Sequence, residues 1–437
     1  MTREMYSGIS KSLYAVVFLV ILLMGINPAQ AELTLGKKYD QTNYQEIQDL
    51  LFPALFNWVK KGKVVLQTGK LEFEWKKNHA FLEASLKNGG KYDIDKDGLL
   101  IEKSAGKPAE FVYGFPFPNI DPKDPKAAEK IMQNKVAQVF SLGSHHAMHR
   151  TSWVSASGRM ERQVLTCIST LYYQQRLEGP LPNPDHFLFQ RMVCVIEPFE
   201  LSGSNNMLWS YNDQREDTVF TYIPATRRVR RVSASDPSNP FLGSDVCPDD
   251  AHMWSGKNAS MKWKLTGEKT LLAPFSSPRK IEVKEFPDGS IDRVFIPIKK
   301  GFEVPGWKGA PWYPVETVWS PRSFWIIEMN SKYTNYNYGR QVLYIDKETY
   351  ASFFKEIYNK DGQQWKTGYG IGGYQVTSTG KDLLGIQDFD TMVDDKTGHS
   401  TPADVIRHPS RDCRMNLPLS VLGPKDFTEN ALIQLSK

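Results

Sequence analysis

The stretch YIPATRRVRRVSAS, residues 222–235, concentrates positive charge, because it places Arg227, Arg228, Arg230 and Arg231 within five positions. Such clusters are typical of nucleic-acid contacts or of a nuclear address. Side chains alternate between the two faces of an extended strand, so the first and last arginines point one way and the middle two the other. A single groove for a phosphate backbone does not fit this alternation. We expect no nucleic-acid partner.

Carboxylates follow about twenty residues later, in GSDVCPDDAHMWSG, which contains Asp245, Asp249 and Asp250. Bidentate arginine–carboxylate pairs are strong and directional. One interpretation is that these pairs clamp a long polar loop, residues 234–256, onto the arginine-rich strand. The alternative is that an arginine meets an anionic head group at the mouth of a cavity.

An acidic stretch, YDIDKDGLLIE, resembles the first half of a calcium-binding EF-hand loop, with Asp93, Asp95, Asp97 and Gly98. The twelfth position of such a loop supplies a bidentate glutamate, whereas this sequence has Ser104 there. We therefore expect an ordinary turn with acidic side chains.

Three histidines in SHHAMHR, His145, His146 and His149, come at the end of a segment that we expect to be helical. A spacing of four residues on one helical face can bind zinc, but no glutamate occupies the HExxH position. A cationic side chain near the carboxy terminus of a helix also stabilises the helix by interacting with its dipole. We expect neither a metal site nor a cofactor.

Sequence signatures of catalysis are weak. The chain lacks a GxSxG elbow and a glycine-rich phosphate loop. Carboxylate pairs such as Asp249 and Asp250 could serve a glycosidase, but any chain of this length contains such pairs. We predict that the protein is not an enzyme.

The amino terminus has the order of a secretory signal peptide: Arg3 and Lys11, an apolar run over 13–24, and Ala29-Gln30-Ala31. The apolar run is shorter than the roughly 20 residues that cross a bilayer. We predict export with cleavage after Ala31, leaving residues 32–437 as one domain. A retained membrane anchor is the alternative.

The composition is that of a globular protein rich in aromatic side chains, which make up 12% of the residues. The formal net charge is +5. A balance this close to neutral gives no general attraction to nucleic acid.

Four cysteines, Cys167, Cys194, Cys247 and Cys413, are an even number, which in an oxidising compartment indicates disulfides. Cys167 and Cys194 are nearly equidistant from the turn EGPLPNPD between two predicted strands. We predict a Cys167–Cys194 bridge across this hairpin and, by elimination, a Cys247–Cys413 bridge.

Helical periodicity covers residues 42–61, where Pro53 should split or kink the helix, and the segment after Asp124-Pro125. Elsewhere the pattern is of short strands, with turns expected at Thr266-Gly267, Ser320-Pro321 and Asp361-Gly362. We predict an α+β fold: a large curved antiparallel sheet, an incomplete barrel, with helices packed on its concave face.

Aromatic residues on these strands could line a hollow inside such a sheet. The candidates are Trp209, Trp263, Trp319, Trp325 and Tyr344. The alternative is that each of these rings simply fills the core.

Four blocks occur in one order: VYGFPFPNIDPKDPKAAEKIMQNK, YIPATRRVRR, DDAHMWSGKNASMKWKLTGEKTLLAP, and RSFWIIEMNSKYTNYNYGRQVLYIDKETYASFFKEIYNKDGQQWK. With these blocks the chain resembles, from about Leu50 to Tyr369, a family of periplasmic proteins of unassigned function, often labelled outer-membrane lipoprotein-sorting proteins. The resemblance implies a fold like that of the lipoprotein carriers LolA and LolB. It also implies association with resistance-nodulation-division (RND) exporters and outer-membrane proteins. It supplies no catalytic residues.

Together these observations favour a periplasmic carrier for a lipid or another hydrophobic molecule, working with an RND-type export system. One alternative is a non-catalytic structural partner or chaperone of an outer-membrane assembly. A hydrolase of envelope glycans or lipids is a further alternative, which requires two titratable groups facing each other in a cleft.

Overall fold

The computed structural model describes residues 33–233, 237–293, 297–409 and 413–435. The predicted signal peptide therefore lies outside the described residues. So do residues 234–236, which belong to the predicted loop.

The first half of the chain contains most of the helices and the first group of long strands. In order these elements are β1 (Lys38–Tyr39), η1 (Tyr44–Leu50), α2 (Pro53–Lys60), β2 (Leu66–Thr68), α3 (His79–Lys87), β3 (Tyr92–Ile94), β4 (Leu100–Glu102), β5 (Lys107–Pro108), α4 (Ala127–Phe140), β6 (His145–Val154), β7 (Met160–Tyr172), β8 (Phe187–Glu197), β9 (Asn205–Tyr211), β10 (Thr218–Ile223) and β11 (Arg228–Ser233).

The second half is dominated by strands. Its elements are η2 (Phe241–Gly243), η3 (Pro248–Met253), η4 (Asn258–Ser260), β12 (Met261–Phe275), β13 (Ile281–Glu282), β14 (Ile291–Asp292), η5 (Gly301–Glu303), β15 (Val318–Ser331), β16 (Gln341–Asp346), β17 (Ser352–Tyr358), β18 (Gln364–Val376), β19 (Asp382–Asp394), β20 (Ser400–Ile406), β21 (Arg414–Met415), η6 (Pro424–Asp426) and α5 (Glu429–Gln434).

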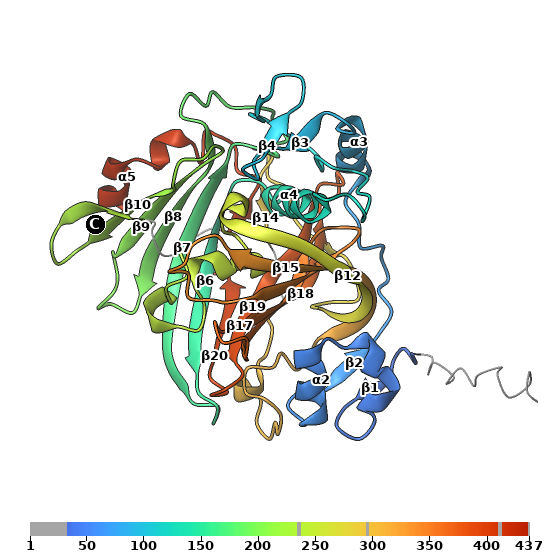
Figure 1. Cartoon of the computed structure of the whole chain (residues 1–437). Helices are drawn as coiled ribbons and strands as arrows, with labels where there is room; N and C mark the ends of the chain where they lie inside the picture. The colour runs from blue at the N-terminus through green and yellow to red at the C-terminus, as the bar shows by residue number, and fades with distance from the viewer. Residues whose placement is uncertain (1–32, 234–236, 294–296, 410–412, 436–437) are drawn as a thin grey trace, which may run out of the picture.

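The long strands form one continuous antiparallel ladder. Its spatial order is β11-β10-β9-β8-β7-β6-β20-β19-β18-β17-β16-β15-β12. We call β6–β11 the amino-terminal wing and β12 with β15–β20 the carboxy-terminal wing; the two meet where β6 pairs with β20. Figure 1 shows the two wings curving toward each other, which confirms the predicted fold class.

Parallel pairing in the described part of the chain is limited to short stretches. β2 pairs in parallel with the start of β15, and the end of β12 and β13 each pair in parallel with β18 inside the carboxy-terminal wing. The sheet is therefore mixed, although its main ladder is antiparallel as predicted.

Bulges let the long strands bend, because an extra residue on one strand increases the local twist. β12 runs through Gly267 with a bulge between Leu265 and Gly267, so the turn predicted there is wrong. The turn predicted at Ser320-Pro321 is also wrong, because both residues belong to β15. The turn at Asp361-Gly362 is confirmed between β17 and β18.

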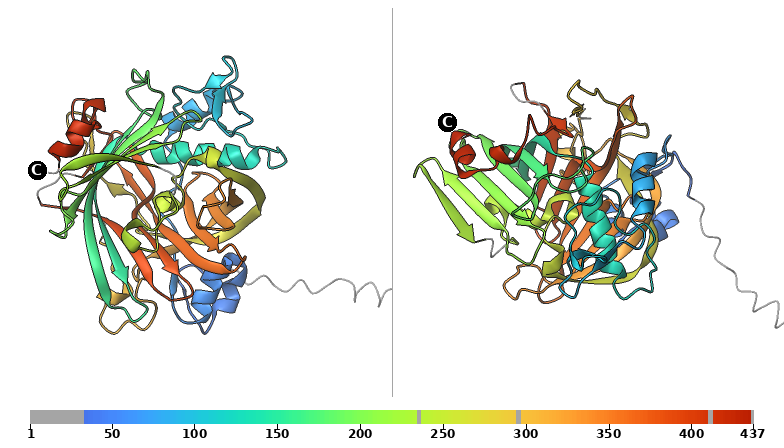
Figure 2. Two further views of the ribbon diagram at one scale, coloured as in Figure 1. Left: turned by 60° about the vertical axis from the view of Figure 1, so that its left-hand side comes forward. Right: turned by 90° about the horizontal axis from the view of Figure 1, so that it is seen from above.

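Pro53 splits the first helical segment as predicted: η1 ends at Leu50, and α2 begins at Pro53. The second predicted helix is α4, which starts after a turn in which Asp124 accepts a hydrogen bond from the Lys126 amide (2.8 Å). Two views show α4 lying between the wings, inside the curve of the sheet (Figure 2). Gln138 fixes it there by donating to the Leu384 carbonyl of β19 (2.9 Å).

Three large hydrophobic clusters stabilise the fold. One fills the space between α2 and the carboxy-terminal wing, the second joins α4 to η3 and β15–β17, and the third lies in the amino-terminal wing. Among the described residues, no helix has the length and apolar character needed to cross a bilayer.

Candidate ligand-binding site

A cavity of about 90 Å³, partly open to solvent, lies against α4. Its walls come from α4, from β8 and β9, from the β3–β4 turn, and from residues 254–259, which lead into β12. A water molecule needs roughly 10–15 Å³, so the cavity has room for several waters. Pockets that enclose a drug-sized ligand span about 300–1,000 Å³, so this one accepts part of a ligand.

Apolar side chains make much of the wall. They are Leu99 and Leu100 from the β3–β4 hairpin, Val136, Val139 and Phe140 from α4, and Leu188 and Phe189 from β8. Phe140 packs on Tyr172 with 4.3 Å between ring centroids, which fixes the end of the helix against the amino-terminal wing. The acidic stretch at 93–98 forms the turn of this hairpin, as predicted, with the Asp95 carboxylate accepting from the amides of Asp97 and Leu99.

Three cationic side chains also line the cavity: Lys135 from α4, Arg191 from β8 and Lys257 from the loop before β12. The Lys135 ammonium donates to the Trp254 carbonyl, which joins the helix to that loop. Burial, with a further contribution from the charge of Lys355, lowers the pKa of Lys135 to about 7. The lining residues, all within the described part of the chain, include no Asp or Glu.

Two lining amides hold polar atoms without a hydrogen-bond partner in the protein: Nδ2 of Asn258 and Oδ1 of Asn212. The other end of each amide is occupied, since Asn258 Oδ1 accepts from Trp254 Nε1 (3.0 Å) and Asn212 Nδ2 donates to the Ala109 carbonyl (2.9 Å). Unpaired buried polar groups are rare and destabilising, so these atoms are positions for water or ligand.

Residues 241–260, here called the covering segment, complete this wall and are held by two anchors. In the inner anchor, Lys355 of β17 donates to Asp250 (2.5 Å), and both side chains are at most 2% exposed. Asp250 also accepts from the Tyr338 hydroxyl (2.8 Å), and Asp249 accepts from the Tyr336 hydroxyl (2.9 Å).

The two inner carboxyls differ in their protonation. Burial raises the pKa of Asp249 to about 7, against the hydrogen bond from Tyr336 and the charge of Lys355. Burial also acts to raise the pKa of Asp250, but the charge and hydrogen bond of Lys355 outweigh it and hold that pKa below its usual value. The Asp250–Lys355 contact is therefore an ion pair, while Asp249 takes up a proton readily.

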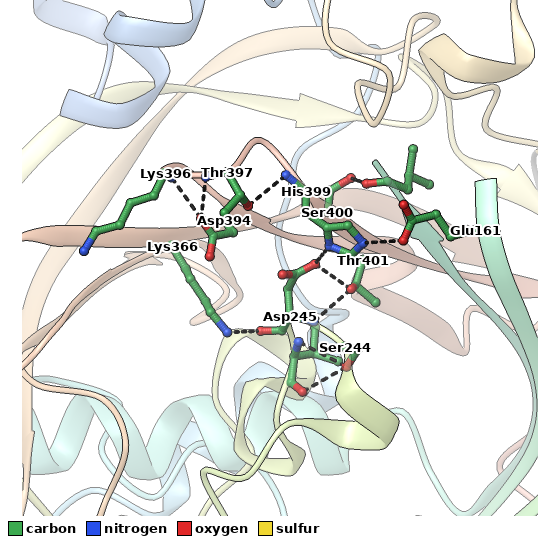
Figure 3. Close-up of polar contacts among 12 residues, drawn as sticks. Glu161, Ser244, Asp245, Lys366, Asp394, Lys396, Thr397, His399, Ser400 and Thr401 are labelled. Atoms are coloured by element: carbon green, nitrogen blue, oxygen red, sulfur yellow. Dashed lines mark hydrogen bonds and ion pairs between the residues drawn. The ribbon is translucent and has the colours of Figure 1, made fainter. Parts of the chain in front are cut away.

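The outer anchor holds the covering segment to β20 through Asp245 (Figure 3). Oδ2 of Asp245 lies 2.6 Å from Nδ1 of His399 and accepts from the Thr401 hydroxyl at 2.8 Å. The Asp245 carbonyl accepts from Lys366 at 2.7 Å. On the other side of the imidazole, Nε2 lies 3.7 Å from Glu161.

A histidine beside a carboxylate is also part of many hydrolytic sites. Here the neighbouring hydroxyls are used in structural hydrogen bonds: Thr401 donates to Asp245, and Ser400 donates to the Val154 carbonyl (3.4 Å). These hydrogen bonds hold the covering segment against β20.

The predicted arginine clamp is wrong. Arg227 lies in the β10–β11 turn with a φ of 50°, and Arg228, Arg230 and Arg231 lie exposed on β11. The Arg231 guanidinium donates to the Thr218 hydroxyl (3.0 Å) of the neighbouring strand. The loop is held by carboxylates as expected, but the partners of Asp249 and Asp250 are tyrosines and Lys355. The arginines do not line the cavity either.

The five aromatic candidates pack in the hydrophobic clusters and are not on the cavity wall. Trp319 and Tyr344 belong to the α2 cluster, Trp325 and Trp263 to the α4 cluster, and Trp209 to that of the amino-terminal wing. The alternative interpretation, that these rings fill the core, is the one that the structure supports.

Cys167 and Cys194 lie directly opposite each other on β7 and β8, so the predicted register of this hairpin is confirmed. The bridge between them stays a prediction. The Cys247–Cys413 bridge is wrong: both are free thiols, in the α4 cluster and the amino-terminal-wing cluster respectively. The Cys413 sulfur accepts from the Met148 amide (3.3 Å).

The histidines expected at a helix end lie on β6 instead. Burial lowers the pKa of His145 to about 3, so this imidazole is neutral at ordinary pH. Among the described residues, no group of three His, Cys, Asp or Glu side chains is placed to hold a metal ion.

Sequence reasoning missed Lys135 and Arg191. Lys135 falls between Ile131 and Val139 at four-residue spacing, and a lysine within an apolar helical stripe is a signal that could have identified it. Arg191 likewise interrupts the apolar stretch FLFQRMVCV of β8. Their convergence depends on long-range packing, which no local pattern contains.

A curved, largely antiparallel sheet around a helix places the chain in the α+β class. The chain belongs to the DUF1329 family, a family of proteins of unknown function whose model matches residues 39–433. The family resemblance inferred from the sequence is confirmed. No curated protein matches the chain.

Several solved structures are similar to this chain. One is a putative outer membrane lipoprotein-sorting protein domain from Vibrio parahaemolyticus, at 18% identity, covering 70% of this chain and 99% of that one, with a TM-score of 0.45. A DUF1329 family protein from Desulfovibrio piger is 15% identical, covering 70% and 98%, with a TM-score of 0.43. A LolA superfamily protein from Nitrosomonas europaea is 13% identical, covering 70% and 98%, with a TM-score of 0.40.

Proposed function

We propose that the protein is a periplasmic, non-catalytic carrier that binds a lipid or another hydrophobic molecule in the cavity against α4. The observation that carries this proposal is the cavity itself: an apolar wall shared by the helix and the amino-terminal wing, closed by a separately anchored segment. The export signal expected from the sequence supports the location.

The size of the cavity sets how a lipid would bind. A volume of about 90 Å³ admits a head group or the end of a chain. Burying ten methylenes of a ligand would contribute about 8 kcal/mol to binding, which corresponds to a Kd near micromolar. The entropy lost when ligand and protein become ordered reduces this affinity. A whole acyl chain therefore requires α4 or the covering segment to move, and closure after release is compatible with reversible transport.

The proposed carrier works with an RND-type exporter and an outer-membrane protein. This part rests on the family resemblance. Crosslinking in intact cells, followed by mass spectrometry, should identify an exporter subunit or an outer-membrane protein; crosslinks to neither would remove this part of the proposal.

The carrier proposal is tested by filling the cavity. Val136 is a half-buried lining residue, so Val136→Trp should displace ligand, whereas Val421→Trp makes the same change at an exposed position outside the lining. Native mass spectrometry of protein purified from its own periplasm should show lipid with the wild type and Val421→Trp, but not with Val136→Trp. Absence of lipid and of apolar-dye displacement in all three proteins would contradict the proposal.

A further inference from the structure

We propose that the ligand is an anionic amphiphile, whose carboxylate or phosphate group binds to Arg191 while its apolar portion contacts α4 and β8. This inference rests on the proposed carrier function and adds the chemical class of the cargo. It follows from the charges, the unpaired polar atoms and the apolar surface that meet in one cavity.

Positive charge in the lining is not balanced from within. Lys135, Arg191 and Lys257 are its charged members. Outside the lining, Asp217 accepts from the Ser210 hydroxyl at 3.1 Å. Asp217, Asp213 and Glu216 act on Lys257, opposing the lowering of its pKa by burial. Among the described residues, the lining itself presents cations and no carboxylate to an anion that enters the cavity.

Arg191 is the best placed of the three. Its Nε donates to the Thr170 hydroxyl (3.2 Å), and its guanidinium lies 4.9 Å from the ring centroid of Phe189. These two contacts orient the group, and among the described residues no carboxylate forms an ion pair with it. A guanidinium that is oriented in this way and not paired with a carboxylate suits bidentate binding of a carboxylate or phosphate.

The other two cations are engaged with backbone carbonyls. Lys257 donates to the Arg215 carbonyl (2.5 Å), and Lys135 donates to that of Trp254. Burial lowers the pKa of both ammonium groups. A bound anion would favour their charged forms, so they add attraction while Arg191 supplies the direct contact.

Asn258 adds a hydrogen-bond donor. Its Oδ1 accepts from Trp254 Nε1, which fixes the orientation of the amide and leaves Nδ2 as a buried donor without a protein partner. A head-group oxygen would satisfy it. Since the apolar wall adjoins these polar groups, the site matches a molecule with one charged end and one hydrocarbon end.

The test compares ligands that differ only in the head. Binding of a long-chain fatty acid, the fatty alcohol of the same length, acetate and inorganic phosphate to the mature protein is measured by titration calorimetry. The wild type should bind the fatty acid at least tenfold more tightly than the alcohol, and acetate or phosphate only weakly.

Substitutions of Arg191 then test whether this residue binds the anionic head group. Arg191→Gln should weaken fatty-acid binding by about tenfold to a hundredfold, the range for a hydrogen bond to a charged group, with little change for the alcohol. Arg191→Lys should retain part of the preference. Arg230→Gln, an exposed arginine of β11, removes the same charge away from the cavity and should change neither affinity.

Each outcome is decisive. Equal binding of acid and alcohol, or an equal loss of both in Arg191→Gln, would overturn the anionic head group while leaving the carrier proposal intact. Tight binding of acetate or phosphate alone would overturn the amphiphile. Failure to bind any long-chain ligand would overturn the carrier proposal itself. Thermal unfolding of each variant shows whether a loss of binding reflects a loss of folding, and in that case Arg191→Lys decides.

Discussion

The two anchors of the covering segment hold the same stretch of chain in different surroundings. In the inner anchor, Asp250 and Lys355 are removed from water and joined by further hydrogen bonds. In the outer anchor, 25% of the His399 side chain and 12% of the Asp245 side chain are exposed. A buried charge without its partner is strongly destabilising, whereas an ion pair that water can reach contributes less. We therefore expect the segment to be held more firmly at Asp250 than at Asp245.

This comparison bears on the cavity, because residues 254–259 of the covering segment line it. The inner anchor lies between these lining residues and Asp245, so opening at the outer anchor would loosen residues 241–247 while the lining residues stay in place.

Breaking the inner ion pair should have the largest effect. Asp250→Ala leaves the Lys355 ammonium buried without a counter-charge, and we expect a loss of about 3–5 kcal/mol in the free energy of unfolding. Urea denaturation measures this loss. The double variant Asp250→Leu with Lys355→Met should recover much of it, and a single variant as stable as the wild type would show that the pair does not anchor the segment.

The inner anchor should also respond to pH through Asp249. Its folded pKa of about 7 is above its ordinary value of 3.8, so the protonated form favours the folded state. The contribution is fully present below pH 3.8 and is lost as the pH rises through 7. Relative to Asp249→Asn, the wild type should lose on the order of 2 kcal/mol between pH 5 and pH 7. Parallel stability profiles for the two proteins would contradict this.

Steric pressure on the inner anchor should give an intermediate effect. A Cβ on Gly256 would lie 2.6–2.8 Å from the Asp249 carboxylate atoms, so Gly256→Ala should destabilise by about 1–3 kcal/mol. Gly267→Ala is the matched control, because nothing lies within 4 Å of its added Cβ. Thermal unfolding compares the two, and equal melting temperatures would show that the carboxylate can shift without loss.

Changing the outer anchor should have the smallest effect on global stability. His399→Gln should cost about 1 kcal/mol, because the imidazole is partly exposed and Asp245 keeps the hydrogen bond from the Thr401 hydroxyl. Hydrogen exchange should nevertheless be faster in residues 241–247 and unchanged in β17. A global loss as large as that of Asp250→Ala would abolish the distinction between the anchors.

Local patterns predicted the elements well where one face of the element is clearly apolar. The helical periodicity of α4 and the break at Pro53 are examples. The equal distances of Cys167 and Cys194 from the turn between them correctly predicted that the two residues pair across β7 and β8. The same reasoning failed at Gly267 and Pro321, because a long strand tolerates a bulge or a proline when the surrounding ladder holds it.

The site was harder to predict, because its contacts join distant parts of the chain. Tyr336 and Asp249 are 87 residues apart, and Lys355 and Asp250 are 105 apart. From the sequence alone, the carboxylate of Asp249 or Asp250 could pair with any cationic side chain. The arginines of β11 are the nearest cationic cluster in the sequence, but they are not the partners in the structure. Burial decides between these partners, and burial is a property of the assembled sheet.

Strand β11 ends the amino-terminal wing, and within the described part of the chain its strand partner is β10. An open strand edge can template pairing with another molecule, and charged side chains along the edge oppose this. Two molecules approaching through β11 would bring Arg228, Arg230 and Arg231 of one against those of the other. We therefore expect the guanidinium groups to oppose self-association through this edge by charge repulsion.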